Sequence, residues 1–194
     1  MTLRTERTKA TQLTRNTRLT SWTAGGLRNE RGELLANQVP GAIVYHEETR
    51  RNKTDKIPDG DPRVSYRNGV RYVIKGRYWL IVKRTEKNVW ECPIYSNNNT
   101  GLELVEHGLW SQYASLVPKG QDPHTFKNQS PGNKMVIIDW MDSDRNRHIR
   151  DTAAVHLAGA VQRPVDRADM KVVGTIQQDQ IEEVSRKALS KSGW

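Results

Sequence analysis

The segment Asn68–Tyr95 reads NGVRYVIKGRYWLIVKRTEKNVWECPIY, and this stretch decides the fold. It is rich in Val, Ile, Tyr and Trp, which favour strands, and these alternate with charged side chains. Asn68-Gly69 predicts a turn, and Gly76 and the polar run 85–88 are expected to connect hairpins. The strands expected between these connections are Val70–Lys75, Arg77–Arg84 and Asn88–Tyr95.

Further strand signals lie on either side of this region. The expected strands there are Gly41–His46, Lys134–Trp140 and Met170–Ile176. Residues 47–68 are charged and interrupted by proline and glycine, which predicts a long loop. Residues 102–117 fit either a strand pair or a short helix, and residues 152–161 fit either a strand or a helix.

The last element is expected to be a helix. Asp179 is its predicted N-cap, because Glu182 follows at the spacing of a capping box. The apolar stripe of this helix comprises Ile181, Val184, Ala188 and Leu189. Several strands followed by one helix predict a mainly β protein of the α+β class, either a small barrel or a rolled antiparallel sheet. We expect one β-rich domain over residues 40–194, after an arm and linker over residues 1–39.

The predicted arm has a regular sequence. Threonine occupies every third position from Thr2 to Thr23, which is the period of an extended polyproline II chain. Such an arm has no core of its own, so we expect it to dock on a partner. The predicted partner-binding residues of the arm are Arg4, Arg7, Lys9, Arg15, Arg18 and Trp22. A disordered tail with a biased composition is the alternative.

The composition points to acidic partners. The chain of 194 residues has a net charge of +9, and its sequence pI is about 9.8. This balance fits binding to nucleic acid or to an acidic protein surface, and it also fits a solvated basic face. The single cysteine excludes a disulfide framework, and no apolar run is long enough for a membrane span. We therefore expect an intracellular, cytoplasmic location, although the Arg- and Thr-rich start also resembles a mitochondrial presequence.

Catalytic patterns are weak in this sequence. The five histidines form none of the paired spacings of metal sites, but a ribonuclease could combine His107, His156 and Lys171. The acidic run Asp139, Asp142 and Asp144 could bind a divalent ion or pair with the arginines that follow it. Cys92 lies in a predicted strand and is expected to be a core residue. We expect no cofactor, no metal and no enzymatic activity.

The basic and aromatic residues over 63–87 form the best candidate surface. Rings beside cations suit base stacking combined with phosphate pairing, as in proteins that bind single strands. The same alternation also fits a sheet with its rings inside and its charges outside. The candidate nucleic-acid residues are Arg67, Arg71, Lys75, Arg77, Lys83, Arg84 and Lys87. The neighbouring rings are Tyr66, Tyr72, Tyr78, Trp79 and Trp90.

Several short motifs over about residues 40–185 resemble a small domain of unknown function that is widespread in filamentous fungi. They are Gly41–Glu47, Arg77–Lys83, Trp90–Ser96, the Gly101 turn, Glu106-His107 and Lys171–Ile176. The family usually has a Ser-Arg pair and an aromatic strand where this chain has Asp151–Val155. The resemblance implies a compact β domain and a fungal host, but no activity and no catalytic residues.

Three functions from different classes follow from these observations. The favoured one is a non-enzymatic assembly protein whose arm docks on a larger protein assembly or on its own oligomer, for example a capsid-surface or accessory protein of a fungal virus. The second is an RNA-binding module that uses the surface over residues 63–87. The third is a ribonuclease-like hydrolase.

Overall fold

The computed structural model describes residues 22–23, 26–27, 37–51, 57–97, 100–125, 129–130, 132–141, 152–165 and 170–194. The predicted arm lies almost wholly outside these residues. Its described parts are the two short strands β1 (Trp22–Thr23) and β2 (Gly26–Leu27), which pair antiparallel.

The remaining strands are β3 (Ala42–Arg51), β4 (Val64–Arg67), β5 (Val70–Arg84), β6 (Asn88–Tyr95), β7 (Tyr113–Pro118), β8 (Val136–Trp140), β9 (Ala154–His156), β10 (Val161–Pro164) and β11 (Lys171–Ile176). The helical elements are the 3-10 turns η3 (His107–Gln112), η4 (Pro123–Thr125), η6 (Leu157–Gly159) and η7 (Gln178–Gln180), and the α-helix α1 (Ile181–Ser192). Residues 102–117 and 152–161, which fitted either strand or helix, thus combine 3-10 turns with strands.

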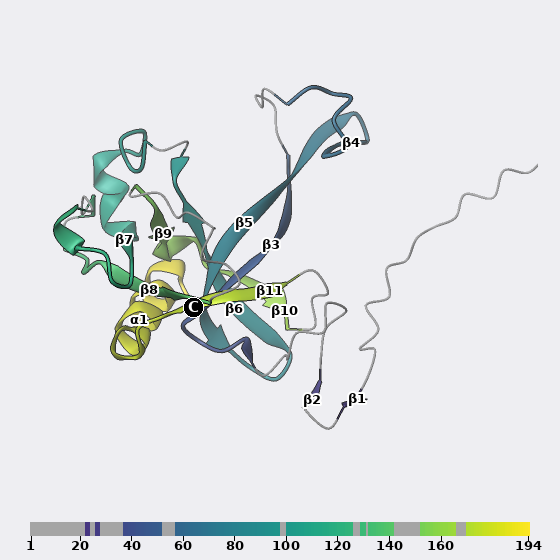
Figure 1. Ribbon diagram of the computed structural model, residues 1–194. Coiled ribbons are helices and arrows are strands. Elements are labelled where there is room, and N and C mark those ends of the chain that lie inside the picture. The colour runs from purple at the N-terminus through teal and green to yellow at the C-terminus, as the bar shows by residue number, and fades with distance from the viewer. Residues whose placement is uncertain are drawn as a thin grey trace, which may run out of the picture.

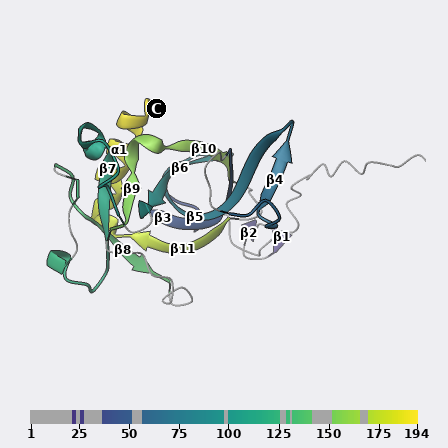
Figure 2. The same ribbon diagram turned by 90° about the horizontal axis from the view of Figure 1, so that it is seen from above.

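Seven of the described strands close into a small barrel. Going round the ring, the order is β6, β9, β7, β8, β11, β3 and β5, and β5 pairs again with β6. β10 and β4 extend this sheet from β6 and β5. All these pairs are antiparallel except β7 and β8, which are parallel. The predicted mainly β fold with a C-terminal helix is confirmed, and the curvature of β3, β5 and β11 is visible in Figure 2.

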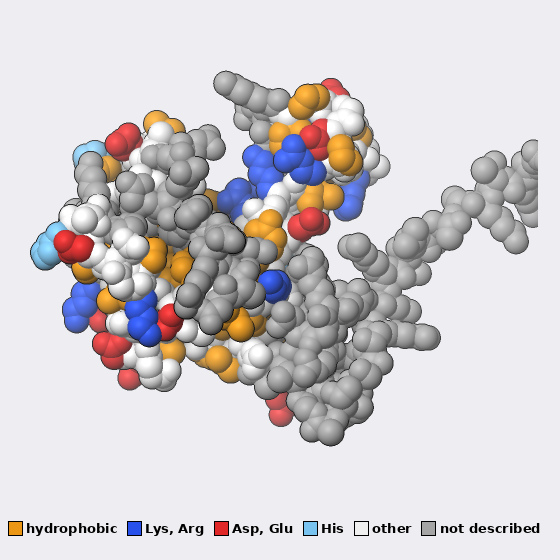
Figure 3. Space-filling model, viewed as in Figure 1, with side chains coloured by type: hydrophobic (Ala, Val, Ile, Leu, Met, Phe, Trp, Pro, Cys, Tyr) orange, Lys and Arg blue, Asp and Glu red, His pale blue; other side chains and the backbone are white. Residues whose placement is uncertain are grey.

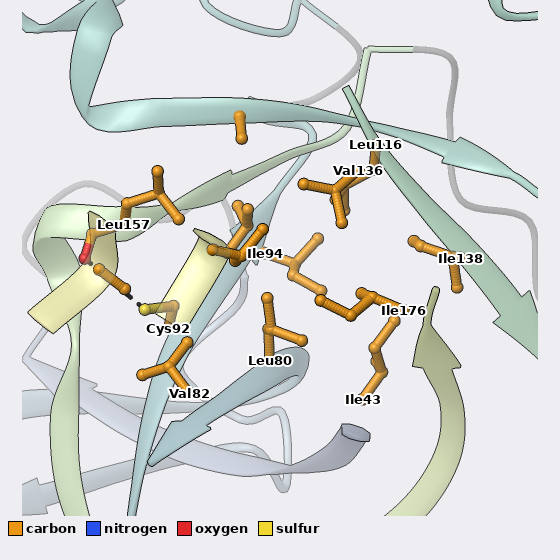
Figure 4. Close-up of a cluster of buried hydrophobic side chains, with 14 of the residues drawn as sticks. Ile43, Leu80, Val82, Cys92, Ile94, Leu116, Val136, Ile138, Leu157 and Ile176 are labelled. Atoms are coloured by element: carbon orange, nitrogen blue, oxygen red, sulfur yellow. Dashed lines mark hydrogen bonds between the residues drawn. The ribbon is translucent and has the colours of Figure 1, made fainter. Parts of the chain in front are cut away.

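The barrel interior holds the main hydrophobic core. Side chains such as Ile43, Leu80 and Ile138 point toward one another there (Figure 4), and Val184 and Ala188 of α1 join the same cluster. Because side chains alternate along a strand, the intervening residues of β3, β5 and β6 lie on the opposite face. That face carries a second buried cluster. Its members are Ala42, Val44, Trp79, Ile81, Val89, Val165, Met170 and Val172.

The predicted break at Gly76 is wrong, because β5 runs without interruption from Val70 to Arg84. Gly76 leaves space for the ring of Tyr45 on β3, since an added Cβ atom would lie 1.8 Å from the Tyr45 hydroxyl oxygen. β3 pairs with β5 as far as Arg51, so the predicted loop over 47–68 contains the end of β3 and all of β4. These strands project from the barrel as a long hairpin (Figure 1).

Two turn predictions at the ends of β5 are confirmed. Asn68 and Gly69 have φ angles of 50° and 70° and join β4 to β5. Both values lie in the left-handed region that Asn and Gly tolerate in a two-residue hairpin turn. At the other end, the Thr85 backbone N–H donates to the Asn88 carbonyl at 2.8 Å and closes the turn between β5 and β6.

The predicted cap of α1 is wrong, whereas its apolar stripe is confirmed. Asp179 lies in the preceding turn η7, and the N-cap residue is Gln180, whose side chain makes no capping bond. That side chain instead accepts from the Ile137 N–H at 2.8 Å and donates to the Met135 carbonyl at 2.9 Å. The Gln180 side chain therefore holds the start of α1 against β8 and does not cap the helix.

Candidate anion-binding cleft

The seven predicted nucleic-acid residues are not gathered on one patch. β5 has 15 residues, so its ends are about 45 Å apart at the rise of an extended strand. Arg67 and Arg71 lie at the hairpin end, and Lys75 and Arg77 lie near the middle of β5. The opposite end carries Lys83, Arg84 and Lys87.

The cations at the two ends have local partners. At the hairpin end, the Arg71 Nε atom donates to Asp59 at 2.8 Å, and this bond lowers the pKa of the Asp59 carboxyl. The Arg67 guanidinium lies 5.7 Å from the ring centroid of Tyr72. At the other end, the Lys83 ammonium lies 4.6 Å from the Trp90 ring. Arg67, Arg71 and Lys83 therefore have contacts within the protein that explain their positions without a bound ligand.

The predicted rings divide between the core and the surface. Trp79 is 1% exposed and Trp90 is 7% exposed, so both are core residues. Tyr66 is 54% exposed at the hairpin end. Base stacking along residues 63–87 would therefore depend on tyrosines alone.

The middle of β5 belongs to a cluster of charges around one carboxylate. Glu48 on β3 lies 2.5 Å from Arg50 Nε and 3.1 Å from Arg77 Nε. Arg163 on β10 approaches the same carboxylate at 3.7 Å. Three guanidinium groups from three strands thus approach Glu48, and Arg163 has a second carboxylate partner in Glu91.

Tyr95 at the end of β6 completes the exposed side of this cluster. Arg50 Nη2 donates to the Tyr95 hydroxyl at 2.9 Å, and the Arg77 guanidinium lies 4.9 Å from the Tyr95 ring centroid. Burial, followed by the neighbouring charge of Arg50, lowers the pKa of Arg77. Since arginine stays protonated in proteins, the Arg77 guanidinium is a partly buried cation that lies close to a second cation, Arg50.

A buried polar group supports the cluster from below. His46 Nε2 lies 2.8 Å from Glu91 Oε1, and both side chains are fully buried. The His46 imidazole stacks on the Trp79 ring at 5.1 Å, and the Arg163 guanidinium lies 4.8 Å from the same ring. Arg163 also forms an ion pair with Glu91. The side chains beneath the cleft are therefore fixed by packing as well as by charge.

The cleft itself occupies a gap in the sheet. On one side, β5 pairs with β4 through residues 70–73 and with β6 through residues 79–84. Between these pairings lies a cleft of about 470 Å³ whose lining includes Arg50, Lys75, Gly76, Arg77, Tyr95 and Asn97. In Figure 3, Lys and Arg side chains gather on the projecting hairpin and in the notch between it and the barrel. Within the described residues, β5 therefore has no strand partner on this side over residues 74–78.

The predicted catalytic sets do not form comparable sites. His156 lies on β9 and Lys171 on β11, and β7 and β8 separate these strands on one side of the ring. The His107 ring stacks on Trp110 at 4.1 Å. Cys92 is a core residue, as predicted, and burial raises the pKa of its thiol to about 12.

The predicted metal site lies only partly within the described chain. Asp139 forms an ion pair with Lys119 at 2.5 Å, whereas Asp142 and Asp144 lie outside the described residues. Among the residues that the structure describes, no three His, Cys, Asp or Glu side chains lie together as a metal site would need.

Some residues around the cleft were missed at the level of sequence. Lys75 and Arg77 were predicted, but Glu48 and Arg50 lay in the supposed loop. Residues 47–51 read EETRR, in which charged side chains do not alternate, so the local sequence carried no two-residue period for this part of β3. Of the predicted arm residues, Arg4, Arg7, Lys9, Arg15 and Arg18 lie outside the described chain, and Trp22 is placed only as part of β1.

Comparison of the chain with protein-family models, with curated proteins and with solved structures gives no match. The resemblance to a fungal domain therefore stays a prediction. None of the helices in the described part of the chain is long and apolar enough to cross a membrane.

Proposed function

We propose that this protein is a non-enzymatic, intracellular RNA-binding module whose cleft takes a phosphate group. The observation that supports the proposal is the sharing of Glu48 by Arg50, Arg77 and Arg163 beside an open cleft. Guanidinium groups match the oxygen geometry of phosphate and are common where phosphate is bound. The net charge of +9 adds long-range attraction for a polyanion.

RNA is the favoured polyanion because aromatic rings accompany the cations. Tyr95 borders the cleft near Arg50 and Arg77, and Tyr66 is exposed on the hairpin beside Asp59 and Arg71. Bases of a single strand stack on such rings, whereas paired bases are not available for stacking. The proposal therefore places a phosphate on the arginines and an adjacent base against a tyrosine.

The test measures binding of a fluorescently labelled single-stranded RNA by anisotropy, at salt concentrations from about 50 to 500 mM. The affinity should fall steeply with salt, as phosphate contacts require. Arg77→Gln should weaken binding at least tenfold. Lys134→Gln, which removes the same charge from an exposed side chain outside the cleft, should change it less than twofold. If the two substitutions weaken RNA binding equally, the cleft contributes no more to binding than any other basic surface, and the proposal is contradicted.

A second candidate function rests on the threonine period of residues 2–23. In this proposal, the arm docks along a larger protein assembly, and the β domain is displayed on its surface. A capsid-surface or accessory protein of a fungal virus would be one such component. The discriminating experiment replaces Arg4, Arg7, Lys9, Arg15 and Arg18 by Gln in the full chain and compares particle mass with and without nuclease. Assemblies that resist nuclease and disappear in this variant would favour docking on protein.

A further inference from the structure

We propose that a groove between β5 and α1 is a second contact site for single-stranded RNA, in which a base stacks on the ring of Trp194. This inference rests on the proposed RNA-binding function and adds a site that holds a base to the cleft that takes a phosphate. The observations that support it are the exposure of Trp194, the contacts that position its ring and the composition of the groove.

Trp194 exposes far more of its surface than the tryptophans of the core. It is 57% exposed, compared with 1% for Trp79 and 7% for Trp90. An indole in contact with water forgoes the free energy of burial, and a flat ligand that covers the ring recovers part of it. Because single exposed apolar side chains are common on protein surfaces, the surroundings of this ring decide whether it has a use.

The Trp194 ring is positioned by contacts of both its backbone and its side chain. Gly193 ends α1 in the left-handed conformation, with a φ angle of 79°, and its N–H donates to the Leu189 carbonyl. The Trp194 N–H donates to the same carbonyl at 3.1 Å. The indole meets the Trp90 ring edge to face, with the two centroids 6.0 Å apart. Little ordering of the ring therefore remains to be done when a ligand binds.

The groove beside this ring is large enough for part of a nucleotide chain. Its volume is about 670 Å³, and ligand sites commonly have volumes of about 300–1,000 Å³. One wall comes from β5 and the other from α1. The described residues of its lining include Val82, Lys83, Ile181, Arg186, Leu189 and Trp194. Apolar side chains thus surround the indole, which suits the flat, weakly hydrated face of a base.

Basic side chains lie on both walls of the groove. Lys83 on β5 and Arg186 on α1 are exposed, and Glu182 is the acidic residue among the described lining residues. The Lys83 ammonium lies 4.6 Å from the ring centroid of Trp90, the ring that Trp194 contacts. Arg84 belongs to the same wall and donates to the Gln38 carbonyl at 3.2 Å. A stacking ring between cations is the arrangement that proteins use for single strands, in which each base is joined to phosphates.

The inference also supplies what the predicted surface lacks. Over residues 63–87 the tryptophans are buried, so stacking there depends on tyrosines. Trp194 lies outside that range and brings an exposed indole to the end of β5 that carries Lys83. Stacking on an aromatic ring contributes about 1–3 kcal/mol per base, which corresponds to a change in affinity of roughly 5- to 150-fold.

The experiment compares two labelled strands of about 20 nucleotides, an oligouridylate and a strand of the same length whose bases are replaced by abasic sites. Binding of the full-length protein is measured by anisotropy. Trp194→Leu should weaken binding of the oligouridylate at least fivefold and change binding of the abasic strand less than twofold. Trp194→Phe, which keeps a smaller ring, should lose less affinity than Trp194→Leu. Leu104→Ala, which removes an apolar side chain that is 79% exposed and does not line the groove, should bind both strands as the unaltered protein does.

Tryptophan fluorescence gives a second readout of the same contact. The oligouridylate should protect the unaltered protein from quenching by acrylamide more than it protects Trp194→Leu, because a stacked base shields the indole from the quencher. A thermal melt of each variant verifies folding. Since Trp194 contacts Trp90, Trp194→Phe carries the comparison if Trp194→Leu is less stable.

The outcomes separate this inference from the function on which it rests. If Trp194→Leu weakens both strands alike or neither of them, while Arg77→Gln weakens the oligouridylate, the stacking inference is overturned and RNA binding by the cleft stands. If neither strand binds the unaltered protein, both proposals are overturned. If the protein self-associates and Trp194→Leu, but not RNA, dissociates the copies, the groove is a contact between protein molecules and the stacking inference is overturned.

Discussion

Replacing Glu91 by Gln tests whether the buried charge cluster supports the fold. Glu91 is fully buried on β6. Its carboxylate lies within hydrogen-bond distance of His46 and forms an ion pair with Arg163. Removing one partner of a buried ion pair costs about 3–5 kcal/mol, because the other charge stays behind without compensation. Arg163 is 22% exposed and keeps Glu48 at 3.7 Å, so we expect a loss of about 3 kcal/mol, at the lower end of this range.

The measurement is urea unfolding followed by circular dichroism, together with a thermal scan. For a chain of this length, a loss of about 3 kcal/mol lowers the midpoint temperature by about 6–12 °C. Glu86→Gln is the matched control, because Glu86 is an exposed carboxylate in the turn that leads into the same strand. This control should shift the free energy of unfolding by less than about 0.5 kcal/mol.

A double-mutant cycle then assigns the loss to the pair. Glu91→Gln and Arg163→Met together should cost at least about 1 kcal/mol less than the sum of the two single changes, because the second change removes a charge that the first left unpaired. If Glu91→Gln resembles its control, or if the two losses simply add, the reasoning about this ion pair is refuted.

Three further changes probe other parts of the fold. Gly76→Ala should lower the free energy of unfolding, measured by urea denaturation, by about 1–3 kcal/mol, because the added Cβ overlaps the packed ring of Tyr45. Gly60→Ala is the control and should be nearly neutral, because its added Cβ meets no atom within 4 Å. The Cys92 thiol has a pKa raised to about 12 by burial, so a thiol reagent at pH 8 should label only the unfolded chain. Since the folded state keeps this proton above the ordinary thiol pKa, stability should fall as the pH rises from about 9 toward 12, and Cys92→Val should reduce that slope. Hydrogen bonds from Arg63 lower the pKa of Asp61 to about 2. This contribution to stability is present above the ordinary carboxyl pKa of about 4 and is lost as the pH falls toward 2. NMR titration of Arg63→Ala should show the Asp61 pKa rising part of the way back, because the backbone N–H of residue 63 still donates to Asp61.

The central hairpin of the fold was predictable from local sequence alone. The turn at Asn68-Gly69, the strand that follows it and the turn before Asn88 all carry direct signals of residue type. The prediction at Gly76 was wrong because sequence alone does not distinguish a glycine that makes room for a neighbouring ring, here that of Tyr45, from a glycine in a turn. The distinction depends on a residue 31 positions earlier in the chain.

The charge cluster was predictable only in part. Lys75 and Arg77 stood out as cations between rings, but their partners come from strands whose pairing the sequence does not state. Register places Glu48 opposite Lys75, and β10 brings Arg163 to β6. One signal was available: Glu91 interrupts an apolar strand, and a carboxylate in such a strand requires a buried donor.

The charges along the unpaired edge of β5 have an alternative explanation, in which the cations only prevent this edge from pairing with a strand of another molecule. Exposed lysines serve that purpose at little cost, since they keep their hydration. Arg77 does not fit this reading, because burial and the nearby charge of Arg50 lower its pKa. Holding two guanidinium groups together at a partly buried position is unfavourable unless a counter-charge is supplied, and both Arg50 and Arg77 contact the one carboxylate of Glu48. An anion bound in the cleft, as proposed, would supply such a counter-charge.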